Sequence, residues 1–278
     1  MKNCLRWMLL MLAVALLSAC ESSAPATPPS SVDDDLSGQI TFAGSTTVQP
    51  LAAKVGERFN EHYPNVELEI AAGGSEVGIK AVQDGAVDIG MASRALTPEE
   101  AEGITVHKFA VDVLAVVVNG EMTIDGLTMG ELRAIYLGEI TTWSAVGGPD
   151  QPIVVVMRGE NSGTRGAFDK IVLDKQAPTA PNLETAVTAG DVAALVLDEP
   201  YAIGYVGFGN IESDLKTLTI DGAAPSKETV RDGSYQLMRP LQFLTGPLTR
   251  PLGQTFIDFA LGEEGQQVVI ENGWAPGG

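Results

Sequence analysis

The sequence predicts an α/β fold with a largely parallel sheet, and three observations carry that prediction. Strand-like and helix-like segments alternate from Gln39 onward. Four of the strand-like segments end in glycine with serine or threonine and lead directly into a helix. At 278 residues the chain exceeds one ordinary domain and suits two lobes of about 100–150 residues each. Ligands of such folds bind at the carboxyl ends of the strands, so the four junctions are the candidate binding loops.

The composition is that of a globular protein, with 45% hydrophobic and 19% charged residues. A net charge of −19 argues against nucleic acid and against anionic membrane surfaces as partners. It does not exclude a small anionic ligand, because net charge acts through a field that salt screens within about 8–10 Å. A buried site works instead through short hydrogen bonds and local dipoles.

The first residues have the pattern of an export signal. Lys2 and Arg6 precede an apolar run, residues 7–17, that is too short to span a membrane. The run ends in Leu17-Ser18-Ala19-Cys20, which resembles the lipobox of bacterial lipoproteins, with cleavage before Cys20 and diacylation of its sulfur. An ordinary secretory peptide cut after Ala19 is the alternative. We expect a signal peptide over residues 1–19 and an exported lipoprotein of the cell membrane that faces the periplasm or the cell exterior.

Residues 21–38 are rich in proline, serine and aspartate and have almost no large apolar side chains. Together with the lipidated Cys20 they predict a disordered tether over residues 20–38. Its acidic run, residues 33–35, indicates a solvated spacer and not a metal site. The other cysteine, Cys4, leaves with the signal, so the mature protein has no disulfide and its core must be large enough to stand alone.

Several further elements can be assigned along the chain. An apolar stripe at Leu51, Val55 and Phe59 predicts the first helix, and the capping-box spacing of Thr97 and Glu100 predicts a later one. The three predicted strands before that box are residues 40–42, 66–70 and 87–91, which end in 43–47, 71–75 and 92–94. Further on, we expect strands at 109–118, 154–157, 203–206, 218–220 and 236–238, and helices at 127–136, 186–197 and around 256–269.

The fourth junction has the most specific composition. The apolar residues 154–157 indicate a buried strand, which Arg158 follows directly, and Ser162-Gly163-Thr164 then opens a helix. Free backbone N–H groups at a helix start, hydroxyl donors and one guanidinium together suit a tetrahedral oxyanion. This stretch therefore predicts half of an anion site, and the earlier junctions predict the other half.

These junctions resemble those of the phosphate-binding lipoproteins of bacterial phosphate ABC transporters, and the resemblance covers nearly all of the mature chain in order. It rests on residues 43–48, 73–75, 87–94, 132–148, 158–164, 202–207 and 256–260. The resemblance implies a type II periplasmic-binding-protein fold, with two α/β lobes, a central cleft and a two-strand hinge. Lobe 1 would be residues 39–116 plus 242–278, and lobe 2 residues 117–241. It also implies inorganic phosphate as the ligand, ABC permease subunits as partners, a monomer, no cofactor and no enzymatic activity.

Carried over by position, Thr46, Thr47 and Ser75 would bind phosphate from lobe 1. From lobe 2 the contacts would be Arg158, Ser162, Gly163 and Thr164, and Ser93 is a further candidate. The hydroxyls and the guanidinium are all donors. The two threonines could instead be only helix N-caps, a role that threonine often has.

One departure from the family concerns the proton of hydrogen phosphate. Some members place an aspartate, which accepts this proton and so rejects sulfate, where this chain has Arg94. We expect Asp112, an acid inside the apolar strand 109–118, to be the acceptor, and Glu160 is the second candidate. Arg94 would then pair with Asp112 or touch the anion.

Three other functions stay open on the sequence alone. The closest is a receptor for another oxyanion, namely sulfate, molybdate or tungstate, and the next is a phosphate sensor without transport. A hydrolase with Ser162 as nucleophile is disfavoured, since neither His62 nor His107 has an acid or cysteine at suitable spacing. No metal site is expected for the same reason.

Overall fold

The computed structural model describes residues 36–277, apart from the side chains of Lys227 and Arg231. The expected signal peptide, Cys20 and most of the expected tether lie outside the described residues. Residues 37 and 38, assigned to the tether from the sequence, are instead the start of the first strand, because Ser37 pairs with Asn65 of the next one. Among the described residues, no helix has both the length and the apolar character needed to cross a membrane.

Three parallel strands and two helices open the chain, as the alternating pattern predicts. In the order β2-β1-β3 the strands form one end of the sheet, and the apolar stripe of the first helix is fully buried against them. Gly44 ends β1 at a φ of +134°, and a Cβ there would lie 2.3 Å from the carbonyl oxygen of Met91. The elements are β1 (Ser37–Gly44), α2 (Gln49–His62), β2 (Asn65–Ala72), α3 (Ser75–Gln83) and β3 (Ile89–Ala92).

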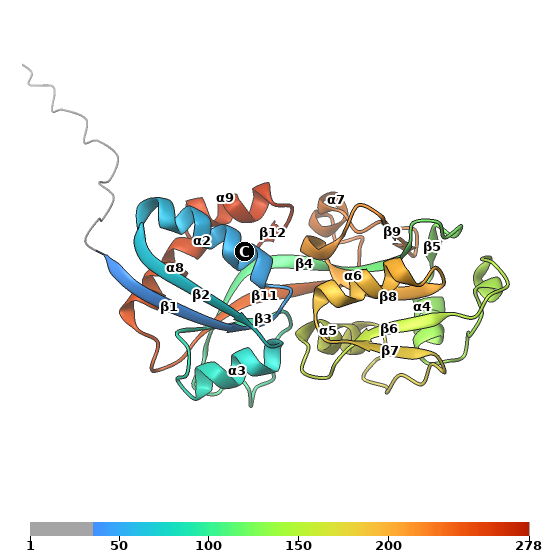
Figure 1. Ribbon diagram of the computed structural model, residues 1–278, viewed down its shortest axis with the longest axis horizontal. Coiled ribbons are helices and arrows are strands. Elements are labelled where there is room, and N and C mark those ends of the chain that lie inside the picture. The colour runs from blue at the N-terminus through green and yellow to red at the C-terminus, as the bar shows by residue number, and fades with distance from the viewer. Residues whose placement is uncertain (1–35, 278) are drawn as a thin grey trace, which may run out of the picture. The chain divides into compact units, whose positions relative to one another are not determined.

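Two long strands then join the two ends of the sheet (Figure 1). The first part of β4 (Thr105–Asn119) runs antiparallel to β11 (Met238–Thr245), and its last part runs antiparallel to β8 (Ala202–Gly207) and β9 (Leu215–Thr217). The strand order is therefore β2-β1-β3-β11-β4-β8-β6-β7. The sheet is parallel toward both ends and antiparallel in the middle, so it is mixed and not largely parallel as expected.

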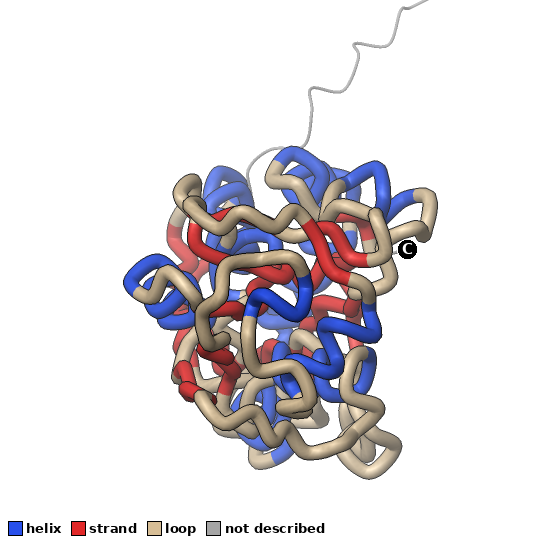
Figure 2. Tube along the Cα trace, turned by 90° about the vertical axis from the view of Figure 1, so that its right-hand side faces the viewer, coloured by secondary structure: helices blue, strands red, loops and turns tan. Residues whose placement is uncertain are grey.

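The second end of the sheet holds β6 (Val154–Arg158), β7 (Leu183–Ala186) and β8, again parallel. Viewed end-on in Figure 2, this part of the molecule shows short helices and long connecting loops toward the reader. Its remaining elements are β5 (Gly126–Leu127), α4 (Met129–Tyr136), η1 (Trp143–Val146), α5 (Gly163–Ile171), α6 (Ala189–Asp198), η2 (Phe208–Asn210), β10 (Thr219–Ile220) and α7 (Lys227–Arg231).

The last helices of the chain pack against its first described helix. Helices α8 (Pro251–Leu261) and α9 (Glu263–Glu271) pack against α2, and β12 (Ala275–Pro276) pairs with β4. One predicted helix is absent: Thr97 and Glu100 form the reciprocal hydrogen bonds of a capping box, but only turns follow. Gly103, at a φ of +71°, follows too soon after the box for a helix to develop.

The buried apolar side chains form two separate sets, and each hydrophobic cluster draws its buried residues from only one of them. The first core draws on residues 40–110 and 241–274, and the second core on residues 113–237. The chain thus changes core near Asp112 on β4 and again near Met238 on β11. The lobe boundaries expected from the sequence, 116/117 and 241/242, lie just C-terminal to these two changes.

Candidate anion-binding site

The loop after β1 is fixed by the hydroxyl of Ser45. Its Oγ accepts hydrogen bonds from the backbone N–H groups of Thr47 (3.2 Å) and Val48 (3.4 Å) and donates one to Ser93 Oγ (2.9 Å). Ser45 and Thr47 are both buried, whereas Thr46 is half-buried. The loop after β1 is therefore tied to the loop after β3, which carries Ser93.

Ser75 extends this network to the start of α3. Its Oγ accepts a hydrogen bond from the backbone N–H of Ser93 (3.0 Å) and lies 3.4 Å from Ser93 Oγ. Ser75 and Ser93 are completely buried. The three expected junctions of the first core thus meet as a row of connected hydroxyls at the carboxyl edge of the parallel strands.

Arg158 approaches this row from the second core. It ends β6, is only 2% exposed, and donates from Nη2 to Thr46 Oγ1 (3.2 Å) and to the carbonyl of Val187 (2.9 Å). Its Nε and Nη1 are buried without a protein partner. Burial lowers the pKa of Arg158 to about 10, and the charge of Arg239 contributes in the same direction. A guanidinium left with two unpaired N–H groups in such surroundings favours a bound anion.

The backbone around Arg158 is held by two side chains. Its N–H donates to the hydroxyl of Tyr205 (3.4 Å), and its carbonyl accepts from Arg165 Nη1 (3.0 Å). Arg165 is itself bound to both oxygens of Asp169 at 2.7 Å. Arg165 therefore positions Arg158.

The start of α5 makes direct contact with the loops of the first core. Thr164 Oγ1 and Thr47 Oγ1 are 2.9 Å apart, and Ser162 caps the helix by accepting from the N–H of Arg165. A Cβ at Gly163 would lie 2.0 Å from Ser75 Oγ, so no larger residue fits there without displacing Ser75. The structure thus brings together Thr46, Thr47, Ser75, Ser93, Arg158, Ser162, Gly163 and Thr164.

Asn161 adds a second connection beside this contact. Its side-chain Nδ2 donates to the carbonyl of Gly73 (2.9 Å), and its own carbonyl accepts from the N–H of Glu76 (3.2 Å). The first contact joins the loop before α5 to the loop before α3, and the second joins it to the first turn of α3. The two helix starts therefore face one place from opposite sides, where their dipoles favour negative charge.

The three residues expected near the ligand's proton differ in their surroundings. Arg94 binds both oxygens of Glu100 (2.6 and 2.7 Å), so its expected pairing with Asp112 is wrong. Glu100 is only six residues away in the sequence and occupies the guanidinium of Arg94. Glu160 is exposed to solvent.

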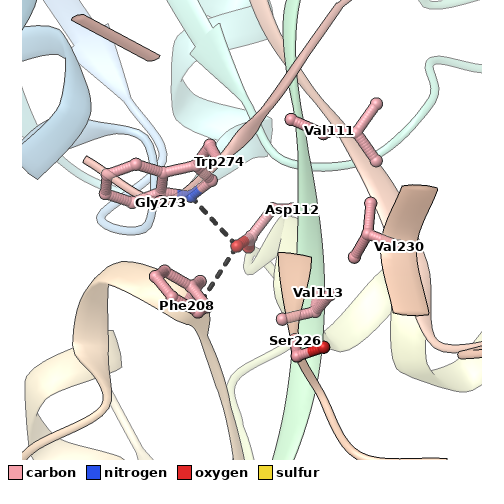
Figure 3. Close-up of a pocket in the computed structure, with 9 residues that line it drawn as sticks. Val111, Asp112, Val113, Phe208, Ser226, Val230, Gly273 and Trp274 are labelled. Carbon is pink, nitrogen blue, oxygen red and sulfur yellow. Dashed lines mark hydrogen bonds between the residues drawn. The ribbon is translucent and has the colours of Figure 1, made fainter. Parts of the chain in front are cut away.

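Asp112 is buried at the point where β4 passes from one core to the other. Figure 3 shows its carboxylate between Phe208 and Trp274. Its Oδ1 accepts from the N–H of Phe208 (2.9 Å) and the indole of Trp274 (3.1 Å), and its Oδ2 accepts from Arg239 at 2.8 and 3.1 Å. Four donors fill the acceptor positions of one carboxylate. Asp112 could accept from a ligand only by giving up one of these bonds.

Sequence reasoning missed Ser45, Tyr205 and Arg239. Ser45 belongs to the same Gly-Ser-Thr loop as Thr46 and could have been included on that ground. Arg239 is the one charged residue between Leu237 and Thr245, and a lone arginine in an apolar strand is a signal that could have been used. Nothing in the local sequence of Tyr205 indicates that its hydroxyl meets the backbone of Arg158.

The histidines take part in ordinary surface or partly buried contacts. His62 pairs with Glu264 (2.7 Å), and His107 with the hydroxyl of Thr245 (2.8 Å). Burial lowers the pKa of His107. Within residues 36–277, no group of three or more potential metal ligands gathers in one place.

The comparisons with known proteins agree with this geometry. A family model described as a PBP superfamily domain matches residues 29–264. The Phosphate-binding protein PstS of Bacillus subtilis (strain 168) is 33% identical over 287 residues, which span 99% of this chain and 94% of the relative. The protein of the same name from Borreliella burgdorferi is 32% identical over 247 residues, spanning 84% and 88%.

Solved structures give the same picture. A phosphate ABC transporter substrate-binding protein from Clostridium perfringens, with bound phosphate, is 34% identical and superposes with a TM-score of 0.82, covering 86% of this chain and 99% of that one. An ABC-type phosphate transport receptor from Vibrio cholerae is 31% identical, with a TM-score of 0.71 over 86% and 100%. These relatives are substrate-binding receptors and not enzymes. The predicted type II periplasmic-binding-protein fold is confirmed, and the chain belongs to the PstS family of phosphate-binding proteins within the PBP superfamily.

Proposed function

We propose that this protein is an extracytoplasmic receptor that binds inorganic phosphate between its two cores and delivers it to an ABC permease. The observation that carries the proposal is the buried guanidinium of Arg158. Its Nε and Nη1 lack a protein partner, while its Nη2 donates to Thr46 in the loop after β1. Phosphate is supported as the anion by relatives named for phosphate binding, one of them solved with phosphate bound.

The proposed ligand contacts are donors from both sides. Arg158 supplies a charged fork and the start of α5 supplies backbone N–H groups, while hydroxyls come from the loops after β1, β2 and β3. The full set is Thr46, Thr47, Ser75, Ser93, Arg158, Ser162, Gly163 and Thr164. Asp112, expected from the sequence to contact the ligand, is left out of this set because four protein donors already bind its oxygens.

The proposed cycle uses β4 and β11 as a two-strand hinge. In the open form the lobes, residues 39–116 plus 242–278 and residues 117–241, separate and admit the anion. Closure replaces its water by fixed donors, and the closed form docks on the permease. Lipid attached to Cys20 would keep a monomeric receptor beside the membrane, on the periplasmic or outer side. Loss of phosphate uptake on deletion of the gene would separate this role from sensing alone.

A second oxyanion is a specific alternative, because the site as described has no free carboxylate oxygen. Hydrogen phosphate has a proton to donate, whereas sulfate has none. A buried acceptor facing sulfate would cost several kcal/mol, and that penalty is the physical basis of discrimination. With Asp112 fully occupied and Glu160 exposed, discrimination here would rest on hydroxyl groups.

The test is titration calorimetry of the chain from residue 21 with phosphate, and then with sulfate and molybdate. Replacing Arg158 by glutamine removes the charged fork, and we expect phosphate affinity to fall roughly a hundredfold or more. Arg133→Gln is the matched control. Arg133 donates to the carbonyl of Val172, the residue that follows the C-terminal end of α5, whereas the proposed ligand contacts lie at its N-terminal end. Unchanged binding in Arg158→Gln, or sulfate binding as tight as phosphate binding, would overturn the phosphate-receptor proposal.

A further inference from the structure

We propose that Arg239 is a second guanidinium of the anion site, held in place by Asp112 and directed at the ligand's negative charge. The inference rests on the anion site proposed above and adds a specificity-determining residue to it. Arg239 lies on β11 beside the crossing point of the two cores, directly opposite Asp112 in the pairing of β11 with β4.

The hydrogen bonding of Arg239 is incomplete on one side. Nε and Nη2 both donate to Asp112 Oδ2, at 3.1 and 2.8 Å, whereas Nη1 is buried without a protein partner. The side chain is 1% exposed and that of Asp112 is 0% exposed. A buried donor without a partner is costly, so the free Nη1 indicates a polar group that the protein itself does not supply.

Arg239 also lies next to residues of the anion site. The point where a Cβ of Gly207 would stand is 2.8 Å from Arg239 Nη2 and 2.7 Å from the methyl group of Thr47. The hydroxyl of the same threonine contacts Thr164. The positive charge of Arg239 is near enough to lower the pKa of Arg158, after the larger effect of burial. Arg239 therefore lies close to Thr47, and Arg158 donates to the adjacent Thr46.

Charge balance explains why two arginines would be buried together. Asp112 neutralises one of the two positive charges, which leaves one buried cation without a counterion. An uncompensated buried charge is strongly destabilising, whereas a multiply charged anion between the two groups would remove the repulsion. Asp112 fixes the orientation of Arg239 and partly offsets its positive charge, without itself touching the ligand. Arg239 would then favour the dianion of phosphate over the monoanion.

Arg239 also lines a cavity of about 150 Å³, together with Arg94, Gly166, Lys170, Ile171 and Pro240 among others. If Nη1 served only water in that cavity, Arg239 would be a structural residue of the hinge. The experiment below separates the two roles through the charge of the ligand, because a structural role would weaken both phosphate ions equally. The charged and titratable groups around Arg239 are Asp112, Tyr205, Arg158, Arg94 and Lys170.

The experiment measures phosphate affinity at about pH 5, where the monoanion dominates, and at about pH 8.5, where the dianion dominates. Wild type is measured first, and failure to bind phosphate at either pH would reject the proposed function itself. The variants are Arg239→Lys and the double variant Asp112→Asn with Arg239→Met, which removes both charges of the Arg239–Asp112 pair together. Arg250→Met is the matched control, since Arg250 also binds a carboxylate through Nε and Nη2, that of Asp88, at the opposite end of β3.

We expect the double variant to lose roughly ten- to hundredfold in affinity at the higher pH and much less at the lower one. Arg239→Lys, which keeps the charge, should retain most of the preference for the dianion. Arg250→Met should bind as wild type does at both values. A double variant that loses affinity equally at both pH values, or that binds like the control, would overturn the inference. If the double variant does not fold, Arg239→Gln measured against Arg239→Lys decides by the same criterion.

Discussion

At the scale of single residues, the orientation of the hydroxyl groups decides what the site can bind. Thr46 Oγ1 accepts from Arg158 Nη2 and from the N–H of Ala189, so its own proton is free to be donated. Ser45 Oγ accepts from two amides and passes its proton to Ser93. Because N–H groups of the protein occupy its lone pairs, the Thr46 hydroxyl faces the site as a donor, whereas the proton of Ser45 is already used within the protein. That polarity suits an anion.

Gly163 offers the clearest single-residue test of the contact between α5 and α3. In Gly163→Ala the new methyl group would overlap Ser75 Oγ, whose side chain is completely buried and bonded to Ser93. The two halves would then be held apart at the point where the anion binds. We expect phosphate affinity to fall roughly ten- to hundredfold, since overpacking of this kind costs about 1–3 kcal/mol. Calorimetric titration measures it.

Gly130→Ala is the control for that substitution. Gly130 lies in α4, and the nearest atom to its added Cβ would be Thr128 Oγ1 at 3.9 Å. Its affinity for phosphate should equal that of wild type, and its stability should rise slightly because alanine favours the helix. Wild-type affinity in Gly163→Ala would show that this close approach is not required for binding.

At the scale of elements, Asp88 joins three segments of the first core. It lies just before β3, accepts from the N–H and hydroxyl of Thr41 on β1, and binds Arg250, the residue before α8. Burial alone would raise the pKa of Asp88, but the hydrogen bonds from Arg250 and Thr41 and the charge of Arg250 lower it to about 2. The ionised form is therefore the one that the fold stabilises.

This depression of the pKa predicts how stability depends on pH. In the unfolded chain Asp88 has an ordinary pKa near 4, so its contribution is complete above that pH and is lost as the pH falls toward 2. The contribution is at most about 2 kcal/mol, reduced by screening at the half-exposed Arg250. In urea unfolding, Asp88→Asn should be less stable than wild type at neutral pH, and the difference should shrink steadily below pH ~4.

Asp258→Asn is the matched control for that series. Asp258 is an exposed carboxylate of α8 whose described partner is Gln254. Its substitution should change stability by less than about 0.5 kcal/mol at every pH. A difference between wild type and Asp88→Asn that stayed constant from neutral pH down to pH ~2 would contradict the argument.

Elements with a strong local pattern could be predicted from the sequence. The stripe at Leu51, Val55 and Phe59 gave α2, and the run 109–118 lies inside β4. The direction of β4 could not be predicted, because an apolar strand has the same pattern whether its neighbours are parallel or antiparallel. The expected helix after Thr97 was wrong because a capping box begins a helix only if enough residues follow it.

The candidate site divides in the same way. Arg158 and the Ser162-Gly163-Thr164 turn lie at the end of β6 and the start of α5 as expected, since their local sequence determines both features. The partner of Asp112 depends on which strand runs beside β4, and that strand comes more than a hundred residues later. Arg239 could therefore be assigned to Asp112 only from the tertiary structure.

At the scale of the whole molecule, two separate cores share one sheet. Buried clusters do not cross between them, and the backbone connects them through β4 and β11. Side chains add further bridges: the partly buried Phe208 packs against both cores, and the anion loops supply others, among them Thr47 to Thr164 and Asn161 to Gly73. Such bridges stabilise the closed arrangement directly, so each of them contributes to the apparent affinity for a ligand that binds only that arrangement.

Asn161 tests this coupling without touching the proposed ligand contacts. Asn161→Ala removes the hydrogen bond to the carbonyl of Gly73 but keeps the backbone bond to Glu76. An exposed hydrogen bond of this kind contributes about 0.5–1 kcal/mol, so phosphate affinity should fall roughly two- to fivefold. The loss should appear as faster dissociation in stopped-flow measurements, because the bridge exists only after closure.

Asn182→Ala, which removes a bond to Ile153 within the second core, should leave the dissociation rate unchanged. If Asn161→Ala instead slowed association and left dissociation unaltered, the bridge would already form in the open receptor, and closure would have to be stabilised by the anion alone.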